Sequence, residues 1–257
     1  MKYAVADFGM SVWEGGCFDI ELRLKDLQSI GYNGIERLEC VDAEDAIHKA
    51  AIFHRMGMDF ATCRCNVQGS CGQQCSNRFT AAFGKEYTWL IPGDTSKNVS
   101  METFVRRSNT FIRACNNYGI KAALHNHLGC RVETQEELDI FMKEVPEAML
   151  LLDIGHLHGA GGDLLGTIEK YFDRIAAVHF KDVFIKDESI GLDRWTERLR
   201  FCELGAGNSN EQWAEAAKLL KKLGYNKWVM VEHDTHLREP LVDLKVSIDK
   251  LKEIFEA

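Results

Sequence analysis

Two kinds of apolar pattern alternate along the chain from its first residues to its last. Short runs of apolar and β-branched residues are typical of buried strands, and segments with apolar residues three and four positions apart are typical of amphipathic helices. Strand-then-helix repetition predicts a parallel sheet covered by helices. The eight predicted strands are Tyr3–Phe8, Gly34–Glu39, Asp59–Cys65, Tyr87–Ile91, Ile120–His127, Met149–Ile154, Ala177–Val183 and Trp228–His233.

Helical periodicity fills most of the intervals between these strands. A glycine that can adopt the left-handed C-cap conformation precedes several strands, as Gly31 and Gly119 do, and Thr134 offers an N-cap oxygen. The interval after Cys65 differs, because its polar Gly- and Cys-containing stretch shows no helical pattern. The predicted helices are Phe18–Ile30, Asp45–Met56, Met101–Tyr118, Gln135–Glu144, Leu164–Phe172, Glu211–Leu223 and Leu241–Phe255.

The number of strand–helix units predicts the architecture. Eight units in 257 residues match the size of a single (β/α)8 TIM barrel, an α/β fold. Length alone also permits two smaller domains, but no Pro- or Ser-rich linker, repeat or low-complexity tract divides the chain. We therefore expect one barrel domain over residues 1–257.

Composition and charge narrow the classes of partner. The chain has 31 Lys and Arg against 39 Asp and Glu, a formal net charge of −8, and 46% hydrophobic residues. Nucleic acid and anionic membranes both attract clustered basic residues, so the acidic balance disfavours both as partners. No apolar export run is visible near the start, and no stretch approaches 18 apolar residues, so we expect a cytoplasmic protein with reduced cysteines.

Four consecutive predicted strands, the fifth to the eighth, end in groups that can bind a metal or a substrate. The C-terminal strand ends form the active site in barrels of this kind. Alternation along a strand places His125 with His127 on one face, and His179 with Lys181 on another. The groups at the four ends are His125-Asn126-His127, Asp153-Ile154-Gly155-His156, His179-Phe180-Lys181 and Glu232-His233-Asp234.

Two of these acidic residues lie in apolar runs. Asp153 follows three leucines and Glu232 follows Val-Met-Val, and an unpaired buried charge is very costly. Asp153, His179 and Glu232, with one group from the fifth strand, would hold one divalent metal ion, which compensates that cost. The alternative is that each residue forms a salt bridge at its own strand end.

The fourth ligand has three candidates near the fifth strand: Glu133, His125 and His127. We favour Glu133, because three carboxylates and one imidazole suit Mn²⁺, Mg²⁺ or Co²⁺. Zn²⁺ is an alternative, and more imidazoles would favour it more strongly.

Other candidate residues have a functional and a structural interpretation. Trp13 follows the first predicted strand, and Glu36 lies in the second. Each would either contact substrate or support the fold. A zinc knot of Cys63, Cys65, Cys71 and Cys75 lacks the paired C-x2-C spacing, so the alternative is that these cysteines pack in the third strand or line the pocket. The glycine-rich 159–163 segment lacks the spacing of nucleotide-binding loops.

Taken together, these motifs resemble the xylose isomerase-like barrels, which include sugar isomerases and epimerases, inosose dehydratases and abasic-site endonucleases. The resemblance covers most of the chain. Its segments are His125-Asn126-His127 with Val132-Glu133-Thr134, Leu151–Leu157, Gly161-Gly162-Asp163, Asp173-Arg174-Ile175, Val178–Asp182, Leu204–Asn208, Leu223-Gly224-Tyr225 and Val229–Glu232.

The resemblance implies specific roles. Glu133, Asp153, His179 and Glu232 would bind the metal, and the two glutamates would also transfer protons on opposite faces of a sugar. The family's substrate-contacting positions resemble Lys181, His156 and His127 here. The Asp-x-Gly-His and His-x-Lys-Asp segments resemble those of inosose dehydratases, whereas Cys202–Asn208 resembles the general epimerase pattern.

We therefore expect a metal-dependent isomerase or epimerase acting on a small sugar or cyclitol. The metal would acidify a C–H beside a carbonyl, and a carboxylate would remove that proton. The alternative is an inosose or 3-keto-sugar dehydratase that shares this step. Loops within 71–78 and 184–200 would shape the substrate. Trp195 and Trp213 would serve a homo-oligomer interface or pack inside the barrel.

Two further hypotheses fit less well. An abasic-site endonuclease with clustered zinc ions predicts a basic groove and more histidines, against which the −8 charge argues. A noncatalytic sugar-binding barrel is disfavoured by the intact set of carboxylates.

Overall fold

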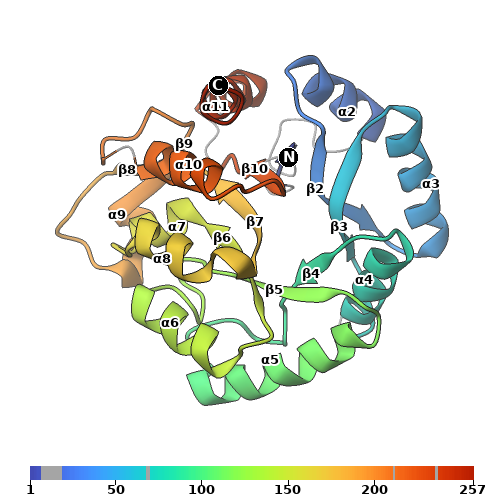
Figure 1. The fold of residues 1–257 in the computed structure, drawn as a ribbon, viewed down its shortest axis with the longest axis horizontal. Helices are drawn as coiled ribbons and strands as arrows, with labels where there is room; N and C mark the ends of the chain where they lie inside the picture. Colours follow the sequence, from blue (N-terminus) through green and yellow to red (C-terminus); the bar gives the residue numbers. More distant parts are fainter. Residues whose placement is uncertain (7–18, 68–69, 211, 235–236) are drawn as a thin grey trace.

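The computed structural model describes residues 1–6, 19–67, 70–210, 212–234 and 237–257. Eight parallel strands form one sheet in the order β3-β2-β1-β10-β7-β6-β5-β4. The two end strands, β3 and β4, lie against each other, so the sheet is a nearly closed barrel (Figure 1). This confirms the predicted (β/α)8 fold. The strands are β1 Lys2–Val5, β2 Gly34–Cys40, β3 Asp59–Cys65, β4 Tyr87–Trp89, β5 Lys121–His125, β6 Met149–Asp153, β7 Ile175–Phe180 and β10 Trp228–Val231.

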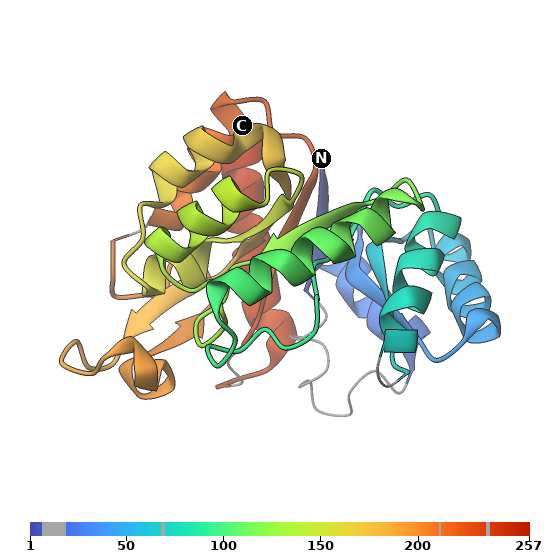
Figure 2. The same ribbon diagram turned by 90° about the horizontal axis from the view of Figure 1, so that it is seen from below.

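Helices surround the strands (Figures 1 and 2). The seven predicted helices are confirmed to within a few residues at each end, and Gly31 and Gly119 have the positive φ that the C-cap prediction requires. Most of the apolar core lies between this outer ring and the sheet. The helices are α2 Ile20–Ser29, α3 Ala43–Arg55, α4 Ser70–Ala82, α5 Met101–Asn116, α6 Gln135–Glu144, α7 Ile154–Gly159, α8 Leu164–Tyr171, α10 Gln212–Lys222 and α11 Pro240–Phe255, with a short 3-10 turn at Phe172–Arg174.

Helix α4 corrects the sequence analysis, which expected no helix after β3 and a substrate loop at 71–78. The helix packs polar side chains on the barrel, so it lacks the apolar period on which the prediction relied. The Cys65 amide donates to Ser76 Oγ at 2.9 Å, and the Cys63 amide donates to Thr80 Oγ1 at 3.2 Å. These hydroxyls satisfy edge amides of β3.

A two-stranded ribbon interrupts the βα order after β7. Strands β8 Asp182–Ile185 and β9 Leu199–Cys202 pair antiparallel, and between them lie a 3-10 turn, Leu192–Arg194, and helix α9, Trp195–Arg198. The ribbon projects at one end of the barrel in Figure 2. The sequence predicted only a substrate-shaping loop at 184–200, because these strands are short and partly exposed.

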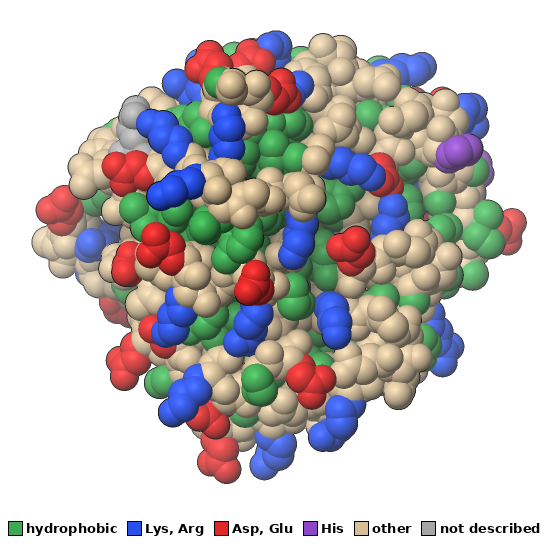
Figure 3. Space-filling model, viewed as in Figure 1, with side chains coloured by type: hydrophobic (Ala, Val, Ile, Leu, Met, Phe, Trp, Pro, Cys, Tyr) green, Lys and Arg blue, Asp and Glu red, His purple; other side chains and the backbone are tan. Residues whose placement is uncertain are grey.

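The outer surface carries mixed charge. Lys and Arg side chains are interspersed with Asp and Glu over the face in Figure 3, as is usual for a solvated surface. Among the helices that the structure describes, none is long and apolar enough to span a bilayer.

The contact between α4 and β3 gives a stability prediction. Thr80→Val keeps the shape but leaves the buried amide of Cys63 without its acceptor, so the free energy of unfolding should fall by about 1–3 kcal/mol. Thr110→Val, the same change at an exposed position of α5, should change it by less than about 0.5 kcal/mol. Urea unfolding of both variants measures the difference. Equal losses would contradict the role of Thr80.

Candidate metal centre

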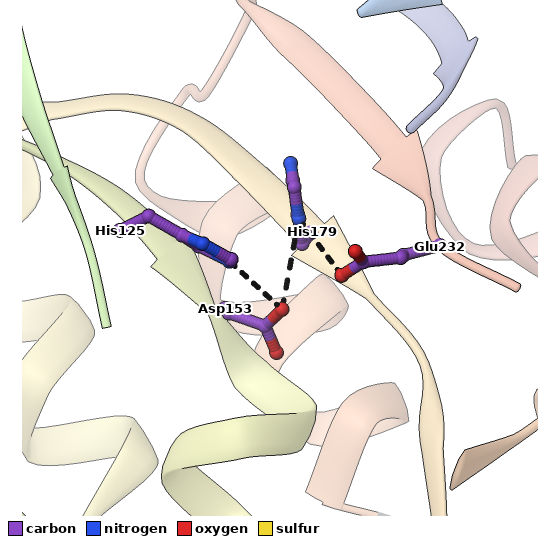
Figure 4. Close-up of side chains that lie close together, drawn as sticks. All are labelled: His125, Asp153, His179 and Glu232. Carbon is purple, nitrogen blue, oxygen red and sulfur yellow. Dashed lines mark hydrogen bonds and ion pairs between the residues drawn. The ribbon is translucent and has the colours of Figure 1, made fainter. Parts of the chain in front are cut away.

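Four side chains from neighbouring strands converge at the C-terminal end of the barrel (Figure 4). Nε2 of His125 lies 3.2 Å from Oδ2 of Asp153. Nδ1 of His179 lies 3.6 Å from the same oxygen and 3.1 Å from Oε2 of Glu232. The candidate ligand atoms of these four residues, which we call the central cluster, all lie within 4.8 Å of one another.

Strand register brings the central cluster together. Asp153 pairs with His179 across β6 and β7, and Glu232 directly follows β10. Asn126 links β5 to β6: its Nδ2 donates to the Asp153 carbonyl, and its Oδ1 accepts from the Asp153 amide, both at 2.9 Å. This buried amide thus fixes Asp153 beside His125. No role for Asn126 was predicted from the sequence, although its place between two histidines was a signal.

Lys181 places a positive charge among the carboxylates. Its Nζ lies 2.9 Å from Oδ2 of Asp153 and 3.0 Å from Oδ2 of Asp234, and it also contacts Oε2 of Glu232. The lysine stem passes over Gly155, where a Cβ would lie 2.4 Å from Cγ of Lys181. A side chain at position 155 would therefore push the ammonium out of place.

Asp153, Glu232 and Lys181 hold one another in their ionised forms. Burial raises the pKa of Asp153 and Glu232, but Lys181 and the neighbouring histidines together outweigh it, holding the pKa of Asp153 well below its usual range and lowering that of Glu232 to about 2. Burial would lower the pKa of Lys181, but Asp153 and the other carboxylates raise it. Burial raises the pKa of Asp234 to about 7, although Lys181 opposes this.

Glu133 lies elsewhere in this structure. Its Oε1 accepts from the Gly129 amide at 2.7 Å, and its Oε2 lies 2.8 Å from Nζ of Lys97. The central cluster has His125 in the place expected for Glu133, one of the two histidines that the sequence left as alternatives. Because Glu133 lies two residues before the start of α6 whereas His125 ends β5, only His125 of the two projects from the strand end itself.

Glu36 and Trp13 were expected at the substrate rim. Glu36 is 0% exposed. Its Oε1 lies 3.1 Å from Nε2 of His179, and it accepts a hydrogen bond from the indole nitrogen of Trp89 at 2.7 Å. It therefore faces the cluster rather than solvent. Trp13 lies outside the described residues.

Two histidines on the pocket wall present opposite tautomers. The rings of His127 and His156 lie 3.7 Å apart between centroids. The Leu128 carbonyl accepts from Nδ1 of His127 at 2.6 Å, and the Leu128 amide donates to Nδ1 of His156 at 3.2 Å. Burial lowers the pKa of both, that of His127 to about 4, so both are neutral at pH 7. His127 therefore offers Nε2 as an acceptor, whereas His156 offers an Nε2–H donor.

A cavity of about 520 Å³ opens beside the cluster. The β8–β9 ribbon supplies one wall through Trp195, Arg200 and Phe201, as the predicted role of 184–200 requires. Asp234, one of the predicted strand-end groups, also lines it, as do Trp89 and Arg37, for which the sequence predicted no role. Of the two tryptophans named for an interface, Trp213 is buried in the core, whereas Trp195 is partly buried and lines this cavity.

The described cysteines lie apart from the central cluster. Cys63 and Cys65 are buried in β3, as the structural interpretation expected, and Cys75 lies on α4. The side chain of Cys71 lies outside the description. Within the described residues, the groups suited to a metal contain no cysteine.

The donor set fits a divalent cation. Two imidazoles and two carboxylates meet at one point, largely shielded from water, and His179 turns Nδ1 toward both carboxylates. Nitrogen–oxygen sites of this kind suit Zn²⁺, Co²⁺ or Mn²⁺, and the second imidazole increases the preference for Zn²⁺ over that of the expected three-carboxylate set.

The buried ammonium gives a second prediction. Without metal, Lys181→Met leaves Asp153 and Glu232 without their main counter-charge, so the chain should lose about 3–5 kcal/mol of stability. Lys170→Met removes an exposed pair with Asp139 and should cost less than about 1 kcal/mol. Thermal unfolding in chelator measures both. A Lys181 variant as stable as the Lys170 variant would contradict this charge balance.

Known proteins share the fold and parts of the sequence. An inosose dehydratase of Bacillus licheniformis is 34% identical over 132 residues, which cover 48% of this chain and 44% of that protein. One of Klebsiella pneumoniae is 32% identical over 155 residues, covering 55% and 51%. The chain thus spans about half the length of the curated relatives it matches.

Two solved structures are similar over almost the whole chain. The IolI protein with a bound zinc atom has a TM-score of 0.74 at 19% identity and covers 100% of both chains. L-ribulose 3-epimerase has a TM-score of 0.72 at 13% identity and covers 99% of this chain and 94% of its own. These identities establish the fold alone. The family model described as "Xylose isomerase-like TIM barrel" matches residues 75–254. The chain therefore belongs to the xylose isomerase-like TIM barrel family, as its motifs predicted.

Proposed function

We propose that this chain is a divalent-metal-dependent dehydratase that removes water from a cyclitol or sugar ketone such as an inosose. The observation that carries the proposal is that Glu232 is the one glutamate in the central cluster, while Glu133 pairs with Lys97. Proton exchange between two opposed glutamates, expected for epimerisation, lacks its second partner. Elimination of water needs one base at carbon and one acid at the leaving oxygen. The inosose dehydratase relatives support the same choice.

His125, Asp153, His179 and Glu232 would hold the metal, which supplies Lewis-acid polarisation of a substrate carbonyl when bound. The Glu232 carboxylate takes the proton from the carbon beside that carbonyl. The carbon–oxygen bond one position further breaks, and the departing hydroxyl leaves as water with a proton from the Asp234 carboxyl. Lys181 links the two carboxyl groups by hydrogen bonds, so the proton that Glu232 gains can replace the one that Asp234 gives up.

The pocket histidines would orient the substrate. Nε2 of His127 accepts a hydrogen bond from a substrate hydroxyl, and the buried His156 supports the His127 ring at a centroid distance of 3.7 Å. Trp195 provides an apolar wall, 6.0 Å from the His156 ring between centroids. This arrangement suits a small uncharged polyol ring with hydroxyls on one edge and C–H groups on the other.

An isomerase or epimerase is the second candidate. It begins with the same proton removal, and the fold shared with L-ribulose 3-epimerase favours it. It differs in that the proton returns to carbon and no bond to oxygen breaks.

The third prediction separates the two reactions. The manganese-loaded chain, incubated with 2-keto-myo-inositol, should produce a conjugated enone that absorbs in the ultraviolet, because dehydration places a double bond beside the carbonyl. Mass spectrometry should show the loss of one water. A product of unchanged mass with inverted configuration would instead establish epimerisation and overturn the dehydratase assignment.

The fourth prediction concerns the two glutamates. Glu232→Gln should lower turnover by about 10²–10⁴-fold, because it removes the base, and should weaken zinc binding. Glu133→Gln should leave zinc affinity unchanged, since Glu133 contacts Lys97 and Gly129. Competition with a chelating dye measures affinity. Full metal occupancy and unchanged turnover in the Glu232 variant would remove that residue from the site.

A further inference from the structure

Glu36 is a fully buried carboxylate with an uneven set of contacts. It lies on β2, across the barrel from β7, and is 0% exposed. Its Oε1 accepts a hydrogen bond from the Trp89 indole at 2.7 Å and lies 3.1 Å from Nε2 of His179. Its Oε2 has no hydrogen-bond partner among the residues that the structure describes.

Such a carboxylate lowers the stability of the fold. A buried charge requires compensation, and a buried polar atom without a partner costs about 1–3 kcal/mol. An apolar side chain at position 36 would avoid both costs. Glu36 therefore points to a role in the site that it faces rather than to stability.

The contact with Glu36 influences which nitrogen of His179 keeps its proton when the ring binds a cation. Nδ1 donates to Oε2 of Glu232 at 3.1 Å, and the Glu36 carboxylate, 3.1 Å from Nε2, favours a proton on that nitrogen as well. A bound cation would therefore displace the proton of Nδ1 and leave the proton of Nε2 in place. Nδ1 is the atom that faces Asp153 and Glu232, at 3.6 and 3.1 Å. The ring is thus prepared to bind a cation on its Nδ1 side.

Glu36 also influences His125, the second histidine of the cluster, through Trp89. The Trp89 ring lies 4.5 Å from the His125 ring and 5.9 Å from the His179 ring, between centroids. The hydrogen bond to Glu36 therefore fixes an indole that packs on both imidazoles of the cluster. Glu36 on β2 thus contacts Trp89 of β4 and His179 of β7 directly, and it influences His125 of β5 through Trp89.

We propose that Glu36 is a positioning residue of the metal centre, which keeps the proton of His179 on Nε2 when Nδ1 binds the cation and, through Trp89, fixes the rings of both histidine ligands. This inference rests on the proposed metal site. It gives Glu36 a role without substrate contact, unlike the rim position expected from the sequence. Partners of this kind typically change metal affinity by about 10–100-fold.

The test uses Glu36→Gln in the full chain, with Zn²⁺ alone as the probe. Its matched control is Glu39→Gln on the same strand, where the side chain is 41% exposed and pairs with Arg64. Competition with a chelating dye should show zinc affinity lowered about 10–100-fold for the Glu36 variant and unchanged for the Glu39 variant. The visible spectrum of the Co²⁺-loaded protein should change only in the Glu36 variant, because ligand geometry alters.

A purely structural role predicts a different result. The Glu36 variant would then melt at a lower temperature without metal, while its folded form would keep the wild-type zinc affinity and Co²⁺ spectrum, and that outcome overturns the inference. If Glu36→Gln fails to fold, Glu36→Asp keeps the charge but withdraws the carboxylate by one carbon and should lose affinity likewise; wild-type affinity in that variant also overturns it. A wild-type chain that binds no zinc overturns the proposed metal site as well.

Discussion

The structure depends on placing several negative charges in the water-poor end of a barrel. Glu36, Asp153 and Glu232 are buried, and Asp234 is nearly so. Lys181 and the imidazole of His179 supply positive charge in direct contact with them. Because buried charge is tolerated only when it is paired, this balance fixes where each strand end must lie. A divalent cation would add positive charge where carboxylate oxygens already converge.

The sequence motifs follow from this constraint. In Asp153-Ile154-Gly155-His156, the aspartate oxygens serve two purposes: Oδ2 faces the cluster, while Oδ1 accepts from the His156 amide at 2.8 Å and begins α7. The glycine leaves space for the lysine stem, and the histidine reaches the pocket wall. Asp182, next to that lysine, accepts from the amides of Gly205 and Gly207 and so ties β8 to the following glycine-containing loop. The motif residues are close in space because each supports the same small volume.

The fold was predictable because all eight strands have clear apolar patterns and several helices end in glycine. Helix α4 was missed because its buried face carries hydroxyl and amide groups rather than apolar ones. Asp153 and Glu232 were predicted as charges in apolar runs, and His179 was predicted from its place on the seventh strand. The fourth member was not, since the choice between His125 and Glu133 depends on where β5 ends, which the local sequence does not encode. The role of Glu36 was also hidden, because its partner lies on the opposite side of the barrel and is 143 positions away along the chain.

The central claim is that His125, Asp153, His179 and Glu232 together bind one divalent ion. Anomalous diffraction from crystals soaked in Zn²⁺ tests it most directly. The account predicts one strong peak about 2.0–2.2 Å from a nitrogen of each histidine and an oxygen of each carboxylate. A peak ligated by Glu133 in place of His125, or zinc confined to surface sites with the four side chains unliganded, would contradict it.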